Sequence, residues 1–288
     1  MAYYPGAEFE NICRIISEQT GLLLVVDNSP ECTLRNLNLK LNANTLIVYN
    51  ENKDAISGAL NIALAHARSH NFEYLHIFDQ DTVPPADITT LLLPSLQADP
   101  KAIITSPRFI NSSTNFPGRV LEHISKWKVK SFWPKEDMGV MKALFTITSA
   151  SLISIKRLPP DTFYDTRLFV DGCDVDFCLY LRNEGFEILV DTSICVTHGI
   201  GSRKKGGGRW SATNYSPFRK QLSAKNRMII WRRYWSTYAG YILSDLFVFT
   251  LDTARTVLLE KGRFTKFIAI CKGIGQGLRE KDIAKRTI

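Results

Sequence analysis

The N-terminal part of the chain alternates between short apolar runs and segments with helical periodicity. The apolar runs Leu22–Val26, Thr45–Tyr49 and Tyr74–Phe78 each end in polar or turn-forming residues, which is typical of buried strands. Helical spacing of apolar residues over 7–19 and an Ala- and Leu-rich stretch at Ala55–Ser69 predict helices between them. Strands and helices that alternate through short turns indicate a parallel sheet with helices on its faces.

The middle of the chain continues this α/β pattern with one irregular interruption. We expect a helix at Ile88–Leu96, a strand at Ala102–Ser106, β-structure over Leu144–Ile155 and a helix within Val170–Gly185. Two short strands are expected at Glu187–Asp191 and Ile194–Thr197. Residues 110–140 have no clear period, which favours a loop or an irregular hairpin.

The C-terminal part is helical and aromatic. Tyr215–Leu259 predicts one or two long helices, but the uncharged stretch Ser236–Ser244 is far shorter than the roughly 20 residues of a membrane-spanning helix. Its aromatic residues favour either an amphipathic surface at a membrane interface or ordinary core packing. We therefore expect an α/β domain at 1–210 and a helical extension at 211–288.

Charge is concentrated in that extension. The chain of 288 residues has a net charge of +8, and from His198 onward 19 basic residues face 5 acidic ones. Such an arm favours anionic membrane surfaces, nucleic acid or phosphate-bearing substrates, although solvated helix faces give the same count. Its aromatic residues cluster in apolar runs instead of alternating with basic residues, so no nucleic-acid partner is expected.

The cysteines and the opening residues bear on the cellular compartment. Six cysteines are scattered without a C-x-x-C pair, which favours a reducing cytosol and argues against a disulfide framework or a zinc site. No signal peptide is visible at the start. We therefore expect a cytoplasmic protein.

The candidate chemistry begins with Asp79-Gln80-Asp81, directly after the apolar run Tyr74–Phe78. Open α/β sheets bind ligands at the carboxyl ends of their strands. Magnesium is typically held by one or two carboxylates together with substrate phosphates. The triplet is thus a candidate seat for a nucleotide diphosphate and its cation, although an Asp before Pro84-Pro85 also suits a simple turn.

A series of motifs follows in a fixed order along the chain, and together they resemble a known family. The motifs are Tyr3-Tyr4-Pro5, Val25-Val26-Asp27-Asn28-Ser29, Asn50-Glu51-Asn52, Asp79-Gln80-Asp81, Asp171-x-x-Asp174-x-Asp176 with Arg182, His198-Gly199-Ile200-Gly201, and Arg219 with Lys225-Asn226-Arg227. The chain resembles the inverting family 2 glycosyltransferases, especially bacterial rhamnosyltransferases of O-antigen and polysaccharide assembly. The implied fold is a Rossmann-like nucleotide-diphospho-sugar transferase sheet (GT-A type) with a helical C-terminal extension.

The resemblance implies a donor site made of residues from the N-terminal part. Tyr3 would pack beside the donor base, Asp27 would bond the base edge, and Asp79 with Gln80 would lie near the nucleoside. Asp81 would bind Mg²⁺ or Mn²⁺ that bridges the two phosphates. His198 would add a metal or phosphate contact, although a histidine before glycine is also common in turns and cores.

The acceptor side is implied to lie across the same cleft. Asp174 matches the base that removes the proton of the attacking hydroxyl, a role that contributes about 10²–10⁴-fold. Asp171 and Asp176 would orient it or shape the acceptor pocket, although acids at a helix N-terminus are also stabilised by its dipole. Arg182 and Arg203 would lie on the acceptor or phosphate side, and for Arg182 a salt bridge is an equal alternative.

The resemblance leaves the donor open and includes two departures from the family. The expected reaction transfers L-rhamnose from dTDP-L-rhamnose to a lipid-linked saccharide at the inner membrane face. A UDP-hexose donor or an inactive binding module are alternatives. The family's opening strand is expected to be missing or abbreviated, because the sequence begins Met1-Ala2-Tyr3. A family glycine is replaced within Thr148-Ser149-Ala150-Ser151.

Overall fold

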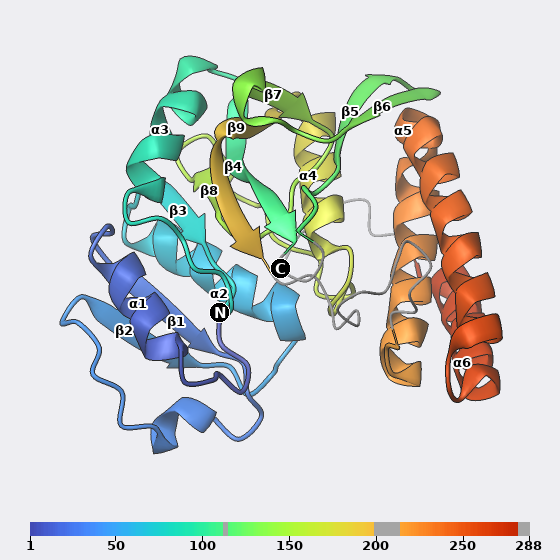
Figure 1. Ribbon diagram of the computed structural model, residues 1–288, viewed down its shortest axis with the longest axis horizontal. Coiled ribbons are helices and arrows are strands. Elements are labelled where there is room, and N and C mark those ends of the chain that lie inside the picture. Colours follow the sequence, from blue (N-terminus) through green and yellow to red (C-terminus); the bar gives the residue numbers. More distant parts are fainter. Residues whose placement is uncertain (112–114, 199–213, 282–288) are drawn as a thin grey trace.

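The computed structural model describes residues 1–111, 115–198 and 214–281, with helices on both faces of a mixed sheet (Figure 1). The helices are α1 (Phe9–Ser17), α2 (Ala55–Ser69), α3 (Ile88–Ala98), α4 (Cys173–Asn183), α5 (Pro217–Leu259) and α6 (Arg263–Arg279). The strands are β1 (Leu23–Asp27), β2 (Thr45–Tyr49), β3 (Tyr74–Ile77), β4 (Ala102–Asn111), β5 (Val120–Ser125), β6 (Lys128–Phe132), β7 (Val140–Ala143), β8 (Ser151–Ser154) and β9 (Glu187–His198).

The described strands form a split sheet whose directions differ from the expectation. β1 and β2 make a parallel pair, while the larger sheet has the order β3-β8-β4-β9-β7. Only β4 and β9 are parallel neighbours there, because β8 runs antiparallel between β3 and β4, and β7 is antiparallel to β9. The expected parallel pairing therefore holds for β1–β2 and β4–β9 but not for β3, β7 and β8, since apolar runs report burial and carry no information on direction.

Several boundaries also differ from the sequence expectations. β9 is one strand where two were expected, and the expected β-structure over Leu144–Ile155 is confined to β8. Residues 110–140 contain the irregular hairpin β5–β6, with a register shift between His123 and Ser125. The helix α6 lies within the helical extension expected at 211–288, although no separate helix was predicted there.

The first residues cross the gap between the two sheets. Ala2 pairs in parallel with Asp27, with its N–H donating to the carbonyl of Val26 at 2.9 Å. The amino group of Met1 donates to the carbonyl of Phe78 at 3.0 Å, which ties the same segment to the end of β3. The expected first strand is thus represented by a single bridge at the carboxyl ends of β1 and β3.

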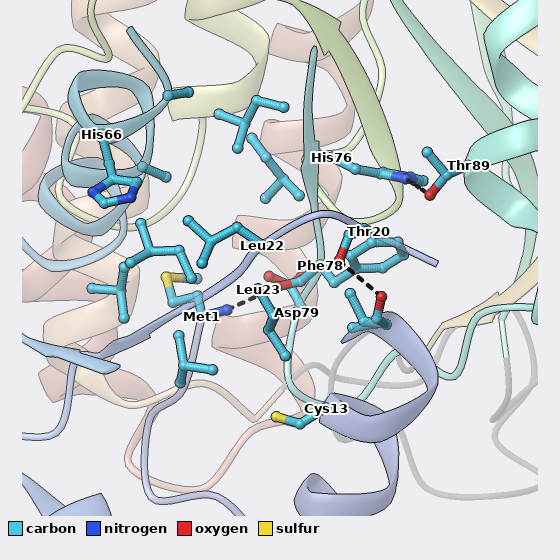
Figure 2. Close-up of a pocket in the computed structure, with 18 of the residues that line it drawn as sticks. Met1, Cys13, Thr20, Leu22, Leu23, His66, His76, Phe78, Asp79 and Thr89 are labelled. Atoms are coloured by element: carbon cyan, nitrogen blue, oxygen red, sulfur yellow. Dashed lines mark hydrogen bonds between the residues drawn. The ribbon is translucent and has the colours of Figure 1, made fainter. Parts of the chain in front are cut away.

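Behind this bridge lies a cavity of about 280 Å³, here called the apolar cavity (Figure 2). Leu22–Val26 and Tyr74–Phe78 line it from the two sheets, and side chains of α1 and α2 close it. Figure 2 shows Met1, Leu22, Leu23 and Cys13 around it, with Asp79 near Met1. The main hydrophobic core lies beyond, on the side of α2, α4 and α5, and a second cluster packs α1 and α3 against the sheet.

The C-terminal helices α5 and α6 pack side by side next to the sheet domain (Figure 1). Helix α5 is interrupted at Tyr238, where the backbone leaves helical geometry (φ −122°, ψ 41°). Gly240 follows, and its N–H donates to the carbonyl of Lys126 at 2.8 Å. A Cβ at Gly240 would lie 2.5 Å from the Trp127 backbone, so only glycine lets the β5–β6 turn pack this closely against α5.

Candidate active site

The turn that follows β3 is held by hydroxyl groups from another part of the sheet. The N–H of Asp79 donates to the hydroxyl of Ser149 at 3.1 Å, and the hydroxyls of Ser149 and Thr82 lie 2.7 Å apart. The next residue, Ala150, has φ +60°, a left-handed conformation that is strained for a residue with a side chain. Asp79 is half-buried in this turn, whereas Asp81 is exposed.

The turn is also connected to the first residues of the chain. The N–H of Tyr3 donates to Oε1 of Gln80 at 2.6 Å, and Nε2 of Gln80 donates back to the carbonyl of Tyr3 at 3.0 Å. The Tyr3 side chain is 49% exposed. The structure therefore brings Tyr3, Asp79 and Gln80 together, as expected of a common site.

Asp27 lies at the end of β1 and is fully buried. Its Oδ1 accepts the N–H of Ser29 at 2.9 Å, and its Oδ2 accepts the N–H of Leu34 at 2.9 Å. Both oxygens thus shape the loop after β1. A nucleotide base that contacts Asp27 would have to share these oxygens with the backbone N–H groups of Ser29 and Leu34.

Asp174 lies in the first turn of α4, which begins after Gly172 in a left-handed conformation (φ +90°). Desolvation by burial raises the pKa of Asp174 to about 6. The Val175 N–H, 2.8 Å from Oδ1, opposes this rise, while the negative charges of Asp171 and Asp79 add to it. A carboxylate of this kind is ionised at neutral pH and still basic enough to accept a proton.

The influence of Asp79 on Asp174 is a spatial observation. The two residues are 95 positions apart in the sequence, yet the charge of one raises the pKa of the other. The turn after β3 and the start of α4 therefore lie within reach of each other's charges.

The other acidic and basic residues of the α4 motif have different surroundings from those expected. Asp176 is fully buried and forms an ion pair with Arg233, and the Tyr234 hydroxyl also donates to it at 3.0 Å. Arg182 pairs with Glu187 at 2.9 Å and donates to the carbonyl of Ala143 at 3.0 Å.

These contacts show what the two side chains do in the fold. Asp176 holds α5 against α4, and Arg182 forms the salt bridge that was one of its two expected roles. In both cases burial beside an oppositely charged partner decides. Asp171 is different, because it is half-buried and pairs with Arg219 at 2.9 Å at the edge of a pocket described below.

Two predicted residues cannot be placed. The backbone of His198 ends β9 and pairs with Asn111, but its side chain lies outside the described residues, and so does Arg203. Within the described part of the chain, no three His, Cys, Asp or Glu side chains gather as a metal cluster. The carboxylates of Asp79 and Asp81 fit a divalent cation only as a partial ligand set, which substrate phosphates complete in sites of this type.

A second pocket, of about 230 Å³, lies between the start of α4, the region around β5 and both halves of α5. We call it the polar pocket. Sequence reasoning missed it, although Asn226 lies within the basic segment Lys225-Asn226-Arg227 that was noted. Asp245 gave no local signal, because it joins the pocket only through the packing of α5.

Comparisons with known proteins agree with this architecture. The glycosyl transferase family 2 model matches residues 10–156, which is just over half of the chain. The chain belongs to glycosyl transferase family 2. It is 23% identical over 236 residues to the dTDP-rhamnosyl transferase RfbF of Shigella flexneri, covering 81% of this chain and 78% of that protein.

Two solved structures share the fold. A mannosyltransferase of Pyrobaculum calidifontis in complex with GDP-Man and Mn²⁺ superposes with a TM-score of 0.57 at 14% identity, covering 98% of this chain and 86% of the other. GalNAc-T7 with UDP, GalNAc and Mn²⁺ gives a TM-score of 0.55 at 13% identity, covering 89% of this chain and 50% of the other. The chain is a glycosyltransferase with the GT-A type of fold and a helical C-terminal region.

Proposed function

We propose that the protein is an inverting, metal-dependent glycosyltransferase that moves L-rhamnose from dTDP-L-rhamnose onto a lipid-linked saccharide during cell-surface polysaccharide synthesis. The proposal is carried by the membership of the chain in this family, together with a carboxylate, Asp174, whose pKa is raised by burial and by the charges of Asp171 and Asp79. The likeness to a dTDP-rhamnosyl transferase over most of both chains supports the choice of donor.

In the proposed reaction, Asp174 accepts the proton of the acceptor hydroxyl while that oxygen attacks the anomeric carbon of the donor. The bond between this carbon and the phosphate oxygen breaks, and the nucleoside diphosphate leaves with the bonding electrons. Asp79 and Asp81 would hold a divalent cation, which neutralises charge on the leaving diphosphate. Tyr3 and Gln80 would border the nucleoside, and Asp171 would hold Arg219 beside the acceptor side.

A screen of nucleotide sugars tests the donor and the need for a metal together. Release of nucleoside diphosphate is measured with dTDP-L-rhamnose and with UDP-hexoses, with Mn²⁺ or Mg²⁺ and with EDTA. We expect release from dTDP-L-rhamnose that EDTA abolishes and that Asp81→Ala removes while the protein stays folded. Faster release from a UDP-hexose would show that the donor is a UDP-hexose. Binding of dTDP without any turnover would show that the protein is a binding module and not an enzyme.

Membrane association is part of the proposal. No helix in the described part of the chain is long and apolar enough to cross a bilayer. Large apolar side chains are nevertheless exposed on α5 and α6, namely Leu243, Leu246, Phe247, Leu258, Leu259, Phe264, Phe267 and Ile268. These side chains and the basic C-terminal part suit a peripheral position on an anionic membrane, which we place at the inner face.

Vesicle sedimentation tests this position. We expect binding to vesicles that contain anionic lipids, weaker binding in high salt, and loss of binding in the double variant Phe264→Asp and Phe267→Asp. A matched pair of substitutions at exposed apolar residues of the sheet domain, Phe116→Asp and Leu91→Asp, is the control. Equal binding of all three proteins would refute the assigned surface.

A further inference from the structure

The polar pocket contains a buried acceptor atom that the protein itself does not satisfy. Asn226 on α5 is 1% exposed and lines the pocket. Its Nδ2 donates to the carbonyl of Asp171 at 2.7 Å, which fixes the orientation of the side-chain amide. Its Oδ1 is buried and has no hydrogen-bond partner. A buried polar atom without a partner costs about 1–3 kcal/mol, so an atom of this kind is expected to serve a ligand.

A carboxylate from the second half of α5 adds a further acceptor. Oδ2 of Asp245 accepts the indole N–H of Trp231 at 2.9 Å and Nε of Arg227 at 3.2 Å. Every hydrogen bond that the described residues make to this side chain uses Oδ2, so Oδ1 remains for a ligand. Asp245 and Asn226 lie on opposite sides of the interruption at Tyr238, so the pocket depends on how the two halves of α5 fold against each other.

The remaining surface of the pocket selects among ligands. Phe145 and Tyr241 form an aromatic wall, with ring centroids 5.4 Å apart in an edge-to-face arrangement. The charged residues that line the pocket are two of each sign, Arg119 and Arg227 against Asp171 and Asp245, so the pocket has no surplus of positive charge to hold an anion. Asp171 is paired with Arg219, and Asp245 with Arg227. Acceptor atoms beside aromatic faces suit a neutral molecule with several hydroxyl groups and an apolar ring face.

The pocket lies beside the proposed base. Gly172 and Val175, which flank Asp174, line it. Burial raises the pKa of the Tyr241 hydroxyl, and the charges of Asp245 and Asp174 both contribute to that rise. The aromatic wall is therefore close to Asp174.

From this geometry we propose that the polar pocket binds one neutral sugar ring of the acceptor, whose hydroxyl groups donate to Oδ1 of Asn226 and Oδ1 of Asp245. Ligand sites are usually ~300–1,000 Å³, so a pocket of about 230 Å³ suits a single ring. The inference rests on the proposed function, since it names the acceptor side of the same site.

The test compares two identical substitutions on α5. Ser244→Leu places a bulky apolar side chain in the pocket, whereas Ser236→Leu places the same side chain on an exposed part of the helix. Binding of free monosaccharides, L-rhamnose, D-galactose, D-glucose, D-mannose and N-acetyl-D-glucosamine, is measured by saturation-transfer NMR. Inorganic phosphate serves as the anionic probe.

We expect at least one monosaccharide to bind the unmodified protein and Ser236→Leu equally. Ser244→Leu and Asn226→Leu should weaken that binding by about tenfold or more, because hydrogen bonds and space are lost. Phosphate should not compete. Absence of monosaccharide binding, competition by phosphate, or equal binding by Ser244→Leu would overturn the inference.

Titration with dTDP and Mn²⁺ separates this inference from the proposed function. Ser244→Leu should still bind the nucleotide and should still catalyse the slow hydrolysis of the donor by water. It should no longer transfer the donor sugar to an acceptor sugar. Asp81→Ala should do the reverse, keeping monosaccharide binding and losing nucleotide binding. If the protein binds a monosaccharide but binds no nucleotide under any condition, the inference about the pocket stands and the proposed function is refuted.

Discussion

The apolar cavity and the polar pocket have similar volumes, about 280 and 230 Å³, but opposite chemistry. The first lies where the sheet is split and is lined mainly by aliphatic side chains from β1, β3, α1 and α2. The second is lined by two carboxylates, two guanidinium groups, one amide, hydroxyls and two aromatic rings beside aliphatic side chains, and it contains a buried acceptor without a partner. Cavity size alone would favour the first as a binding site.

The difference shows which observation identifies a site. The residues that line the apolar cavity also include two buried ring nitrogens without a partner, Nε2 of His66 and Nε2 of His76. Its lining is nevertheless mainly aliphatic and leaves van der Waals contacts unmade, so its main consequence is lower stability. A polar pocket beside an acid with a raised pKa offers both binding and proton transfer. The following experiments are arranged from the largest expected effect to the smallest.

Replacing the proposed base should have the largest effect. Asp174→Asn keeps the shape of the side chain and an oxygen for the Val175 N–H, but it cannot accept the proton. We expect kcat to fall by about 10²–10⁴-fold while nucleotide binding is retained. Steady-state kinetics and dTDP titration measure the two. Near-normal turnover would assign proton removal to another residue.

Breaking the ion pair behind the polar pocket should mainly affect stability. Arg233→Met leaves the fully buried Asp176 without its cationic partner. We expect the free energy of unfolding in urea to fall by about 3–5 kcal/mol. The control is Arg14→Met, which removes an ion pair to Glu18 that is more than half exposed, and it should change stability by about 1 kcal/mol or less. Equal effects of the two variants would contradict the assigned role.

The pKa of Asp174 predicts a pH dependence with a definite sign. Below about 6 the base is protonated in the folded protein, so kcat/KM should fall about tenfold per pH unit there. The folded protein also binds this proton more tightly than the unfolded chain, so the associated stability is lost as pH rises from about 4 to about 6. At roughly 1.4 kcal/mol per pKa unit, this loss is at most about 3 kcal/mol.

Comparison with Asp174→Asn isolates this effect. The variant should lack the stability change between pH 4 and 6 and should be more stable than the unmodified protein at pH 8. Urea denaturation at several pH values measures it. A parallel pH dependence in both proteins would place the titration on another group.

Filling each cavity with the same side chain gives the smallest effect and the most direct comparison. Ala63→Leu enters the apolar cavity from α2, and we expect the free energy of unfolding to rise by about 0.5–2 kcal/mol with turnover unchanged. Ser244→Leu enters the polar pocket, covers acceptor atoms without satisfying them, and should not stabilise. Stabilisation by Ser244→Leu but not Ala63→Leu would reverse the distinction between the two cavities.

Local pattern predicted much of the fold. The bounds of β2 and α2 agree with the expectation from sequence, because β2 is a short apolar run that ends in polar residues and α2 is an Ala- and Leu-rich stretch of helical length. The hairpin β5–β6 was expected only as one of two alternatives, and β7 was not separated from its neighbours. Short strands at the edge of a sheet have little burial and hence little pattern.

The sequence predicted which residues belong to the candidate site but not which role each residue has. Asp171, Asp174 and Asp176 lie within six residues, and their sequence pattern gives no reason to treat them differently. In the structure Asp176 is paired with Arg233 and Asp171 with Arg219, whereas burial raises the pKa of Asp174. Each partner comes from a segment at least 48 residues away.

The sequence by itself determined where strands and helices form and which motifs stand at strand ends and helix starts, since period and turn chemistry act between near neighbours. Tertiary structure alone decided which carboxylate is neutralised, which is desolvated, and that α5 completes a pocket beside Asp174. The physical reason is that burial and charge pairing depend on residues distant in the chain, which meet only when the sheet and the C-terminal helices pack together.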